Sequence, residues 1–175
     1  MKKKGIIFFD RDGTLIKAPM KKNGKPGSIR SFEHIIYTKG AAKLCKRLSK
    51  EFYLVMITNQ PEYSRGINTK KNIMKINLKI KKKLNLDKTY VCFCENNTCN
   101  MRKPNTGMIV KALRFYDLKA KNCYVIGDRW RDILAGKKAG CNTILLKKNY
   151  KERFVKPDYE VRNFDKINTM TKLFD

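Results

Sequence analysis

The sequence predicts an α/β fold in which one central parallel sheet is covered by helices on both faces. Short apolar runs with the character of buried strands alternate along the chain with amphipathic segments of helical spacing. Parallel neighbours need a crossover connection, which is usually a helix. The chain has 175 residues, of which 42% are hydrophobic, and this is enough to bury one core. We therefore expect a single domain over residues 1–175.

Six strands are expected, because each candidate is a short, continuous apolar run. Such runs are typical of strands that are buried on both faces. The first run, Gly-Ile-Ile-Phe-Phe, ends at Asp10, and the second ends at Thr58. The expected strands cover residues 5–9, 52–57, 89–93, 123–126, 143–146 and 159–161.

Five helices are expected between and after these strands. Their apolar residues recur every three or four positions, as Ile73, Ile76 and Ile80 do on one face of the second helix. Gly140 is a typical residue for the end of the fourth helix. Residues 17–30 are polar and contain glycine and proline, so we expect a surface loop there. The expected helices cover residues 40–50, 69–84, 106–116, 131–139 and 163–173.

The chain is strongly basic, with 41 Lys and Arg residues against 15 Asp and Glu residues and a formal net charge of +26. Such a charge is compatible with a nucleic-acid partner. Lysines outnumber arginines by 31 to 10, however, and they are spread along the whole chain. Because arginine is the residue preferred for bidentate contacts with phosphates and bases, this composition favours a solvated surface over a nucleic-acid site.

No apolar run approaches the roughly 18–20 residues that a membrane-spanning helix needs. The basic start of the chain is followed by an apolar stretch of about five residues, which is too short for the core of a signal peptide. We therefore expect a cytoplasmic protein without a membrane partner, acting as a monomer or a small homo-oligomer.

Three of the six cysteines are clustered, namely Cys92, Cys94 and Cys99. In an intracellular chain, such a cluster indicates a metal site before it indicates a disulfide. The single cysteines have apolar or strand-end neighbours and are expected to be small buried residues. They are Cys45, Cys123 and Cys141.

Polar side chains stand where three of the expected strands end. In open α/β sheets, ligands bind outside the carboxyl ends of the strands. One carboxylate alone is readily explained as a helix cap or a turn residue, but capping does not require this repeated placement. The residues form three pairs: Asp10 and Asp12, Thr58 and Asn59, and Asp128 and Asp132.

Four segments around these residues resemble the motifs of the haloacid dehalogenase (HAD) superfamily. In chain order they are Phe-Asp-Arg-Asp-Gly-Thr (9–14), Thr-Asn-Gln (58–60), Arg-Lys-Pro (102–104) and Gly-Asp-Arg-Trp-Arg-Asp (127–132). The cysteine segment before the third motif resembles one branch, the heptose-bisphosphate and histidinol-phosphate phosphatases of subclass IIIA. The resemblance implies a HAD-like, Rossmann-type three-layer sandwich. The segments between the motifs are too short for a large cap domain.

The resemblance implies a phosphatase mechanism, and the needs of phosphoryl transfer agree with it. Asp10 would be the nucleophile and form an aspartyl-phosphate. Asp12 would protonate the leaving oxygen and then activate water. Mg²⁺ prefers oxygen ligands, and it would be held by Asp10, Asp128 and the backbone carbonyl of Asp12, with Asp132 acting directly or through water.

The remaining motif residues would contact the phosphoryl group or the rest of the substrate. Thr58 would bind a phosphoryl oxygen, and Lys103 would neutralise the nucleophile and the phosphoryl charge. Arg102 offers a fork for a second phosphate or another substrate oxygen. Three further substrate-side candidates are Asn59, Gln60 and Arg65.

The cysteine segment departs from the pattern of the branch that it resembles. There, a Cys-x-His and a Cys-x-Cys pair bind a structural Zn²⁺, whereas the matching positions here are Cys92, Cys94, Cys99 and Met101. Cysteine replaces histidine readily, but a thioether is a poor zinc ligand because it carries no charge. Three alternatives stay open: a three-cysteine site completed by water or another group, a weakened site, and a segment without metal.

The favoured function is a Mg²⁺-dependent phosphomonoester hydrolase acting on a small phosphorylated metabolite, above all a sugar (heptose) bisphosphate. A polynucleotide 3′-phosphatase is the alternative, since such enzymes carry similar motifs and the charge suits them. A non-catalytic scaffold is disfavoured, because Asp10 and Asp12 are present together with Thr58, Lys103 and Asp128.

Overall fold

The computed structural model of the protein describes residues 3–174, so residues 1, 2 and 175 of the expected domain lie outside the described residues. Within this range the strands form one six-stranded sheet of order β3-β2-β1-β4-β5-β6, in which every neighbouring pair is parallel. The predicted α/β class is therefore confirmed. The strands are β1 (Gly5–Phe9), β2 (Phe52–Asn59), β3 (Lys88–Cys92), β4 (Tyr124–Gly127), β5 (Asn142–Leu146) and β6 (Tyr159–Val161).

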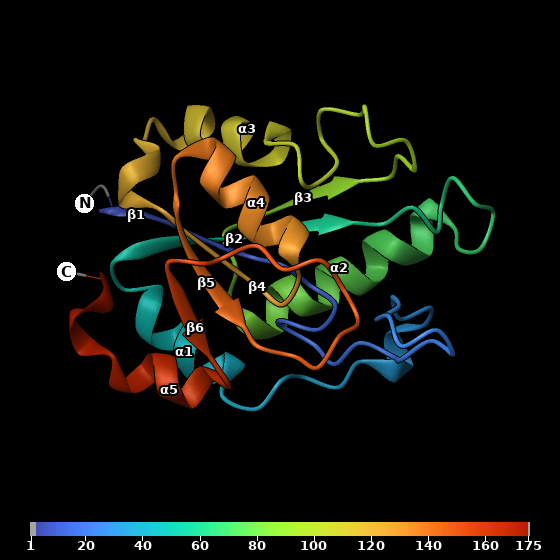
Figure 1. Cartoon of the computed structure of the whole chain (residues 1–175), viewed down its shortest axis with the longest axis horizontal. Helices are drawn as coiled ribbons and strands as arrows, with labels where there is room; N and C mark the ends of the chain where they lie inside the picture. The colour runs from blue at the N-terminus through green and yellow to red at the C-terminus, as the bar shows by residue number, and fades with distance from the viewer. Residues whose placement is uncertain (1–2, 175) are drawn as a thin grey trace.

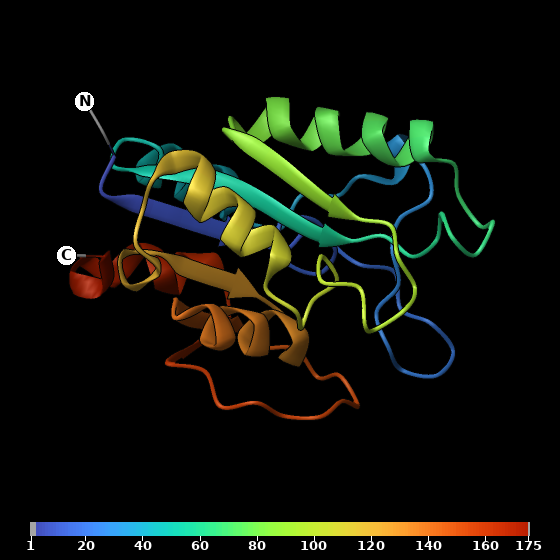
Figure 2. The ribbon, with the colours of Figure 1, turned by 90° about the horizontal axis from the view of Figure 1, so that it is seen from above.

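Helices cover both faces of the sheet and give the molecule three layers (Figures 1 and 2). Three helices pack on one face and two on the other, each group over its own hydrophobic cluster. The first group is α1 (Ala41–Leu48), α2 (Lys70–Leu84) and α5 (Phe164–Thr169), and the second is α3 (Gly107–Tyr116) and α4 (Trp130–Ala139). Short 3-10 turns are η1 (Phe32–His34), η2 (Ala120–Asn122) and η3 (Thr171–Phe174). None of the helices within residues 3–174 is long and apolar enough to span a membrane.

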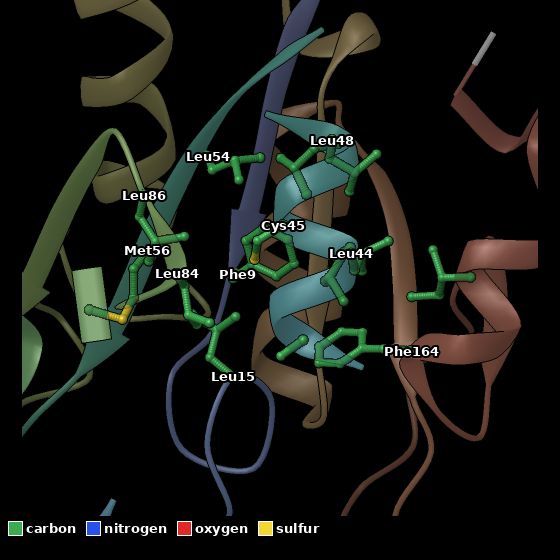
Figure 3. Packing of buried hydrophobic residues seen from close by; sticks show 14 of the residues in the cluster. Phe9, Leu15, Leu44, Cys45, Leu48, Leu54, Met56, Leu84, Leu86 and Phe164 are labelled. Carbon is green, nitrogen blue, oxygen red and sulfur yellow. The ribbon is translucent and has the colours of Figure 1, made fainter. Parts of the chain in front are cut away.

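The two clusters explain why β1 is apolar at every position. Ile7 and Phe9 of β1 belong to the cluster under α1, whereas Ile6 and Phe8 belong to the cluster under α3 and α4. Leu44 of α1 packs against the first of these faces (Figure 3). The three single cysteines are buried, as expected; they are Cys45, Cys123 and Cys141.

Several elements begin or end one or a few residues away from the predicted positions, and two of these differences have a clear structural reason. β2 continues through Thr58 to Asn59, because both residues still pair with β3. The expected closing helix of residues 163–173 is broken at Met170, where the backbone leaves the helical region. The break has a packing reason, since it lets the following turn η3 place Phe174 in the core cluster.

The strand order reverses between β1 and β4, which are neighbours in the sheet. This reversal is the position at which open α/β sheets bind ligands. The segments that follow β1, β2 and β3 gather at the same end of the sheet (Figure 2). The expected loop of residues 17–30 lies in the first of these segments, and a bridge between Met20 and Pro26 closes its tip.

The substitution Leu44→Ala tests the packing of α1 on the sheet. Leu44 is completely buried, so we expect its truncation to lower the free energy of unfolding by about 2–5 kcal/mol. Leu78→Ala is the matched control, because Leu78 on α2 is 51% exposed; its effect should stay below about 1 kcal/mol. Denaturant titrations followed by circular dichroism measure both values. Equal losses in the two variants would contradict this account of the core.

Candidate active site

Three carboxylates meet at the point where the strand order reverses. Asp10 follows β1, Asp128 follows β4, and Asp132 lies in the first turn of α4. Each offers an oxygen atom within 4.8 Å of the others, and all three residues are buried. Gly127 permits this approach, because a Cβ atom there would lie only 2.3 Å from the Cβ atom of Asp132. The fold thus concentrates negative charge where water is scarce.

Lys103 supplies the counter-charge for this group. Its Nζ atom lies 2.5 Å from Oδ1 of Asp10 and 2.6 Å from Oδ1 of Asp132. It also donates a hydrogen bond to the backbone carbonyl of Ile57 at 2.9 Å. Burial alone would lower the pKa of Lys103, but the two carboxylates outweigh burial and raise it. The ammonium group is therefore charged and held between the two aspartates.

Asn59 fixes the backbone of Lys103. Its amide nitrogen donates to the Lys103 carbonyl oxygen at 3.0 Å, and its amide oxygen accepts from the Lys103 backbone N–H at 3.1 Å. These two bonds tie the end of β2 to the segment that follows β3. Asn59, a predicted substrate-side residue, lines the pocket, but its side-chain amide is already used to position Lys103.

Asp12 belongs to a second buried network, which contains a residue that the sequence analysis did not single out. Arg11 is completely buried, and its guanidinium group lies 2.8 Å from Oδ2 of Asp12. It also donates to Oδ1 of Asn77 at 2.8 Å and to Oε1 of Gln60 at 2.7 Å. Gln60 in turn donates to Oδ2 of Asp12 at 2.9 Å and to Oγ1 of Thr58 at 3.0 Å.

Gln60 therefore does not have the substrate-side position predicted for it. Its side chain is 0% exposed and is directed beneath Asp12 instead of into the pocket. The physical reason is the charge of Arg11, which needs neutral and anionic acceptors on every side once it is buried. One sequence signal was available, because Asn77 is a polar residue on the apolar face of α2.

Burial raises the pKa of Asp10 to about 6, although Lys103 opposes this rise. Burial and the neighbouring carboxylates also raise the pKa of Asp128. The Tyr150 hydroxyl beside Asp128 partly offsets this rise in pKa. Oδ1 of Asp128 accepts a hydrogen bond from Thr14 at 2.9 Å. Its buried Oδ2 atom has no hydrogen bond of ordinary geometry within residues 3–174. A site of this kind suits a cation, which would favour the ionised carboxylates.

A pocket with a volume of about 260 Å³ lies over this site, and six of the predicted site residues line it: Asp10, Asp12, Thr58, Asn59, Lys103 and Asp132. Its walls contain cations that the sequence analysis did not propose: Lys21 and Lys25 from the 17–30 loop, and Arg129 and Arg131 near the start of α4. Arg129 is paired with Glu152. Single charges in a chain with 41 basic residues carry no signal in the sequence, and only the fold shows which of them face the site.

The two predicted arginines also border this pocket. Arg102 is oriented by a hydrogen bond to the backbone carbonyl of Cys94 at 2.8 Å and by another to Oδ1 of Asn97 at 3.3 Å. Arg65 lies nearer the surface and pairs with Glu95 at 2.7 Å. Arg102 is thus held rigidly at the wall, whereas Arg65 forms part of the rim.

The clustered cysteines lie together between β3 and Lys103. The Sγ atoms of Cys92, Cys94 and Cys99 lie within 4.8 Å of one another, and those of Cys92 and Cys99 are 3.8 Å apart. Met101 is partly buried against the cluster under α3 and α4. Burial raises the pKa of Cys92 to about 12. The structure therefore presents three converging sulfur atoms on the segment that carries Lys103.

Comparison with known proteins identifies the class. Residues 100–165 match the family model described as HAD-hydrolase-like. A protein from Campylobacter jejuni, D-glycero-alpha-D-manno-heptose-1,7-bisphosphate 7-phosphatase, is 32% identical over 146 residues, which cover 80% of this chain and 80% of that protein. The chain belongs to the family of HAD-like phosphatases.

Within that family, the chain is related to the heptose-1,7-bisphosphate 7-phosphatases. The D-glycero-beta-D-manno-heptose-1,7-bisphosphate 7-phosphatase of Haemophilus ducreyi is 29% identical over 157 residues, covering 82% of each protein. The crystal structure of D,D-heptose 1,7-bisphosphate phosphatase from B. bronchiseptica, complexed with magnesium and phosphate, superposes with a TM-score of 0.78. It is 23% identical and covers 93% of this chain and 94% of that one. The predicted HAD-like fold without a large cap is confirmed.

The substitution Gln60→Leu separates positioning from substrate contact. It leaves Arg11 and Asp12 without a shared partner, so we expect kcat to fall by about tenfold to a hundredfold. KM should change by less than about threefold, because this side chain does not reach the pocket. Steady-state kinetics with a phosphate monoester measures both constants. A higher KM at unchanged kcat would instead support a contact between Gln60 and the substrate, as the sequence predicts.

Proposed function

We propose that this chain hydrolyses a small phosphorylated sugar of the heptose-bisphosphate class through an aspartyl-phosphate on Asp10. The observation that carries the proposal is the placement of two carboxylates with different partners at one pocket floor. Asp10 faces the ammonium group of Lys103, whereas Asp12 is held from behind by Arg11 and Gln60. Carboxylates in different surroundings are suited to different roles in one reaction.

In the first half of the proposed reaction, a carboxylate oxygen of Asp10 forms a bond to phosphorus while the bond to the leaving oxygen breaks. Lys103 balances negative charge on Asp10 and on the phosphoryl oxygens. Asp12 gives its proton to the leaving oxygen. In the second half, Asp12 takes a proton from water, whose oxygen attacks phosphorus and releases the Asp10 carboxylate together with inorganic phosphate.

The residues fit a magnesium ion at this site. Asp10, Asp128 and Asp132 offer converging oxygen atoms, and the buried Oδ2 of Asp128 still lacks an ordinary hydrogen-bond partner in the described part of the chain. Together with the backbone carbonyl of Asp12, they form the all-oxygen set that Mg²⁺ prefers. When bound, the ion supplies positive charge to the phosphoryl oxygens.

The substrate class rests on the relatives and on the charge of the pocket. The relatives described above are named for heptose bisphosphates of both α and β configuration. Besides Arg129, which is paired with Glu152, the pocket walls hold Lys21, Lys25, Arg102 and Arg131, which is more positive charge than one phosphoryl group requires. This supports a substrate with a second phosphate. The predicted cytoplasmic location and small-molecule partner belong to the same proposal.

We further propose that the three clustered cysteines hold a structural Zn²⁺. Three converging sulfur atoms supply three of the four positions in a tetrahedral zinc site. Met101 carries no charge, so a water molecule or another group would take the fourth position. The ion would order the segment that presents Arg102 and Lys103, away from the reacting phosphate.

A substrate panel tests the proposed function. With Mg²⁺ present, wild-type protein should prefer a heptose 1,7-bisphosphate to histidinol phosphate and to an oligonucleotide with a 3′-phosphate, measured as released phosphate. Asp10→Asn should lower the rate by at least about a thousandfold, because it removes the nucleophile. Asp165→Asn, an exposed site on α5, should behave as wild type. Preference for the oligonucleotide, falling steeply with salt, would favour the polynucleotide 3′-phosphatase, which the net charge of +26 makes the second candidate.

Thermal unfolding tests the magnesium site without relying on activity. At a Mg²⁺ concentration of about 100 times Kd, binding to the folded state adds about 2.7 kcal/mol, or about 5–10 °C in Tm for a chain of this size. We expect this increase in wild type and in Asp165→Asn. Asp128→Asn should lose it, because one buried ligand is removed. An equal increase in Asp128→Asn would place the ion elsewhere.

Metal analysis of purified protein tests the zinc proposal. We expect about one zinc ion per chain in wild type and in the control variant Cys45→Ala. Cys45 is buried and is distant in sequence from the cysteine cluster. Cys94→Ala should retain far less zinc, since it removes one of three ligands. Wild-type protein that is free of zinc after expression with added metal would show that the cysteine segment does not bind zinc.

A further inference from the structure

Glu62 is a buried carboxylate that the proposed reaction does not use. It follows β2 by three residues, and its side chain is only 8% exposed. Its Oε2 atom is buried and has no hydrogen-bond partner within residues 3–174. The backbone around it is well fixed, because the Glu62 carbonyl accepts hydrogen bonds from the N–H groups of Ile67 at 2.8 Å and Asn68 at 3.1 Å. The backbone at Glu62 is therefore fixed, while the Oε2 atom of its side chain has no partner among the described residues.

This side chain stands between two cavities. It lines the pocket of Asp10 and also a neighbouring cavity of about 660 Å³. The second cavity lies between the 17–30 loop and the segment after β2, and its apolar wall includes Met20, Ile29, Ile36 and Ile67. A molecule whose phosphate reached Asp10 would have room for its remainder there, and it would pass Glu62.

Burying a carboxylate oxygen without a hydrogen-bond donor costs free energy of folding. The unpartnered Oε2 atom of Glu62 therefore indicates a donor that arrives with a ligand. Neighbouring cations do not supply one in the described residues: Arg65 pairs with Glu95 instead, and no ion pair joins Lys21 to Glu62. An ionised carboxylate only accepts hydrogen bonds, so the ligand must carry O–H or N–H groups. The cavity is also lined by Lys17, Lys21 and Arg30, which disfavour a cationic ligand such as an alkyl ammonium.

We propose that Glu62 accepts hydrogen bonds from hydroxyl groups on the alcohol part of the substrate and so selects polyhydroxylated phosphate esters. The C–H faces of that part lie against the apolar wall formed by Met20, Ile29, Ile36 and Ile67. Neutral hydroxyl groups satisfy the carboxylate without opposing the cations around it. This inference rests on the proposed function and adds a specificity-determining residue to it.

The test compares two phosphate esters, of which only the first carries hydroxyl groups on its alcohol part: a heptose 1,7-bisphosphate and 4-nitrophenyl phosphate. Glu62→Leu should lower kcat/KM for the sugar ester by about tenfold to a hundredfold, mainly through KM, because it removes charge-assisted hydrogen bonds. For the aryl ester, kcat/KM should stay within about threefold. Glu62→Gln keeps an acceptor and should lose less on the sugar. Glu33→Gln, at an exposed site, controls for the loss of one negative charge.

A Tm equal to or above that of wild type should accompany Glu62→Leu, since an unpartnered buried carboxylate is removed. Equal losses on both esters, or an unchanged kcat/KM for the sugar, would overturn the inference while the wild-type activity upheld the proposed function. Wild-type protein that hydrolysed neither ester would overturn both.

Discussion

The structure depends on keeping three aspartates and one lysine together where the strand order reverses. Asp10, Asp128 and Asp132 lie close enough to repel one another, and burial further disfavours the charges of Asp10 and Asp128. Lys103 balances part of this charge through short contacts to two of them, and a bound divalent ion would balance more. This arrangement is held in position by the ends of β1 and β4, by Asn59 and by the cysteine segment.

A second buried cation gives Asp12 surroundings of its own. Arg11 is fully enclosed and is satisfied by its sequence neighbour Asp12 and by two residues from distant parts of the chain, Gln60 and Asn77. This network connects β1, the end of β2 and α2 beneath the pocket floor. Removing one partner from such a network leaves a buried charge without compensation, which is more damaging than losing a surface contact. Its contribution to the site is therefore one of orientation.

The positive charge of the chain is distributed less uniformly than its composition suggests. Most lysines lie on solvated faces, but residues from the 17–30 loop and from α4 bring four further cations to the pocket. The surface loop predicted from the sequence thus contributes charge to the site. Glu62 is an acidic residue among these cations. The burial of its Oε2 atom without a partner in residues 3–174 distinguishes it from the acidic residues that form surface pairs.

The order of strands and helices and the meeting of Asp10, Asp128 and Asp132 could be predicted from the sequence, because buried strands are continuously apolar and parallel strands present their carboxyl ends at one edge. Local patterns did not reveal that Gln60 turns beneath Asp12, that Asn59 holds Lys103, or that Arg129 and Arg131 face the pocket. These four residues lie at or just beyond one end of β2 or α4, so their contacts depend on which segments pack against those ends. Periodicity sets orientation within an element, whereas past its end only tertiary packing and the need to satisfy buried charges decide it.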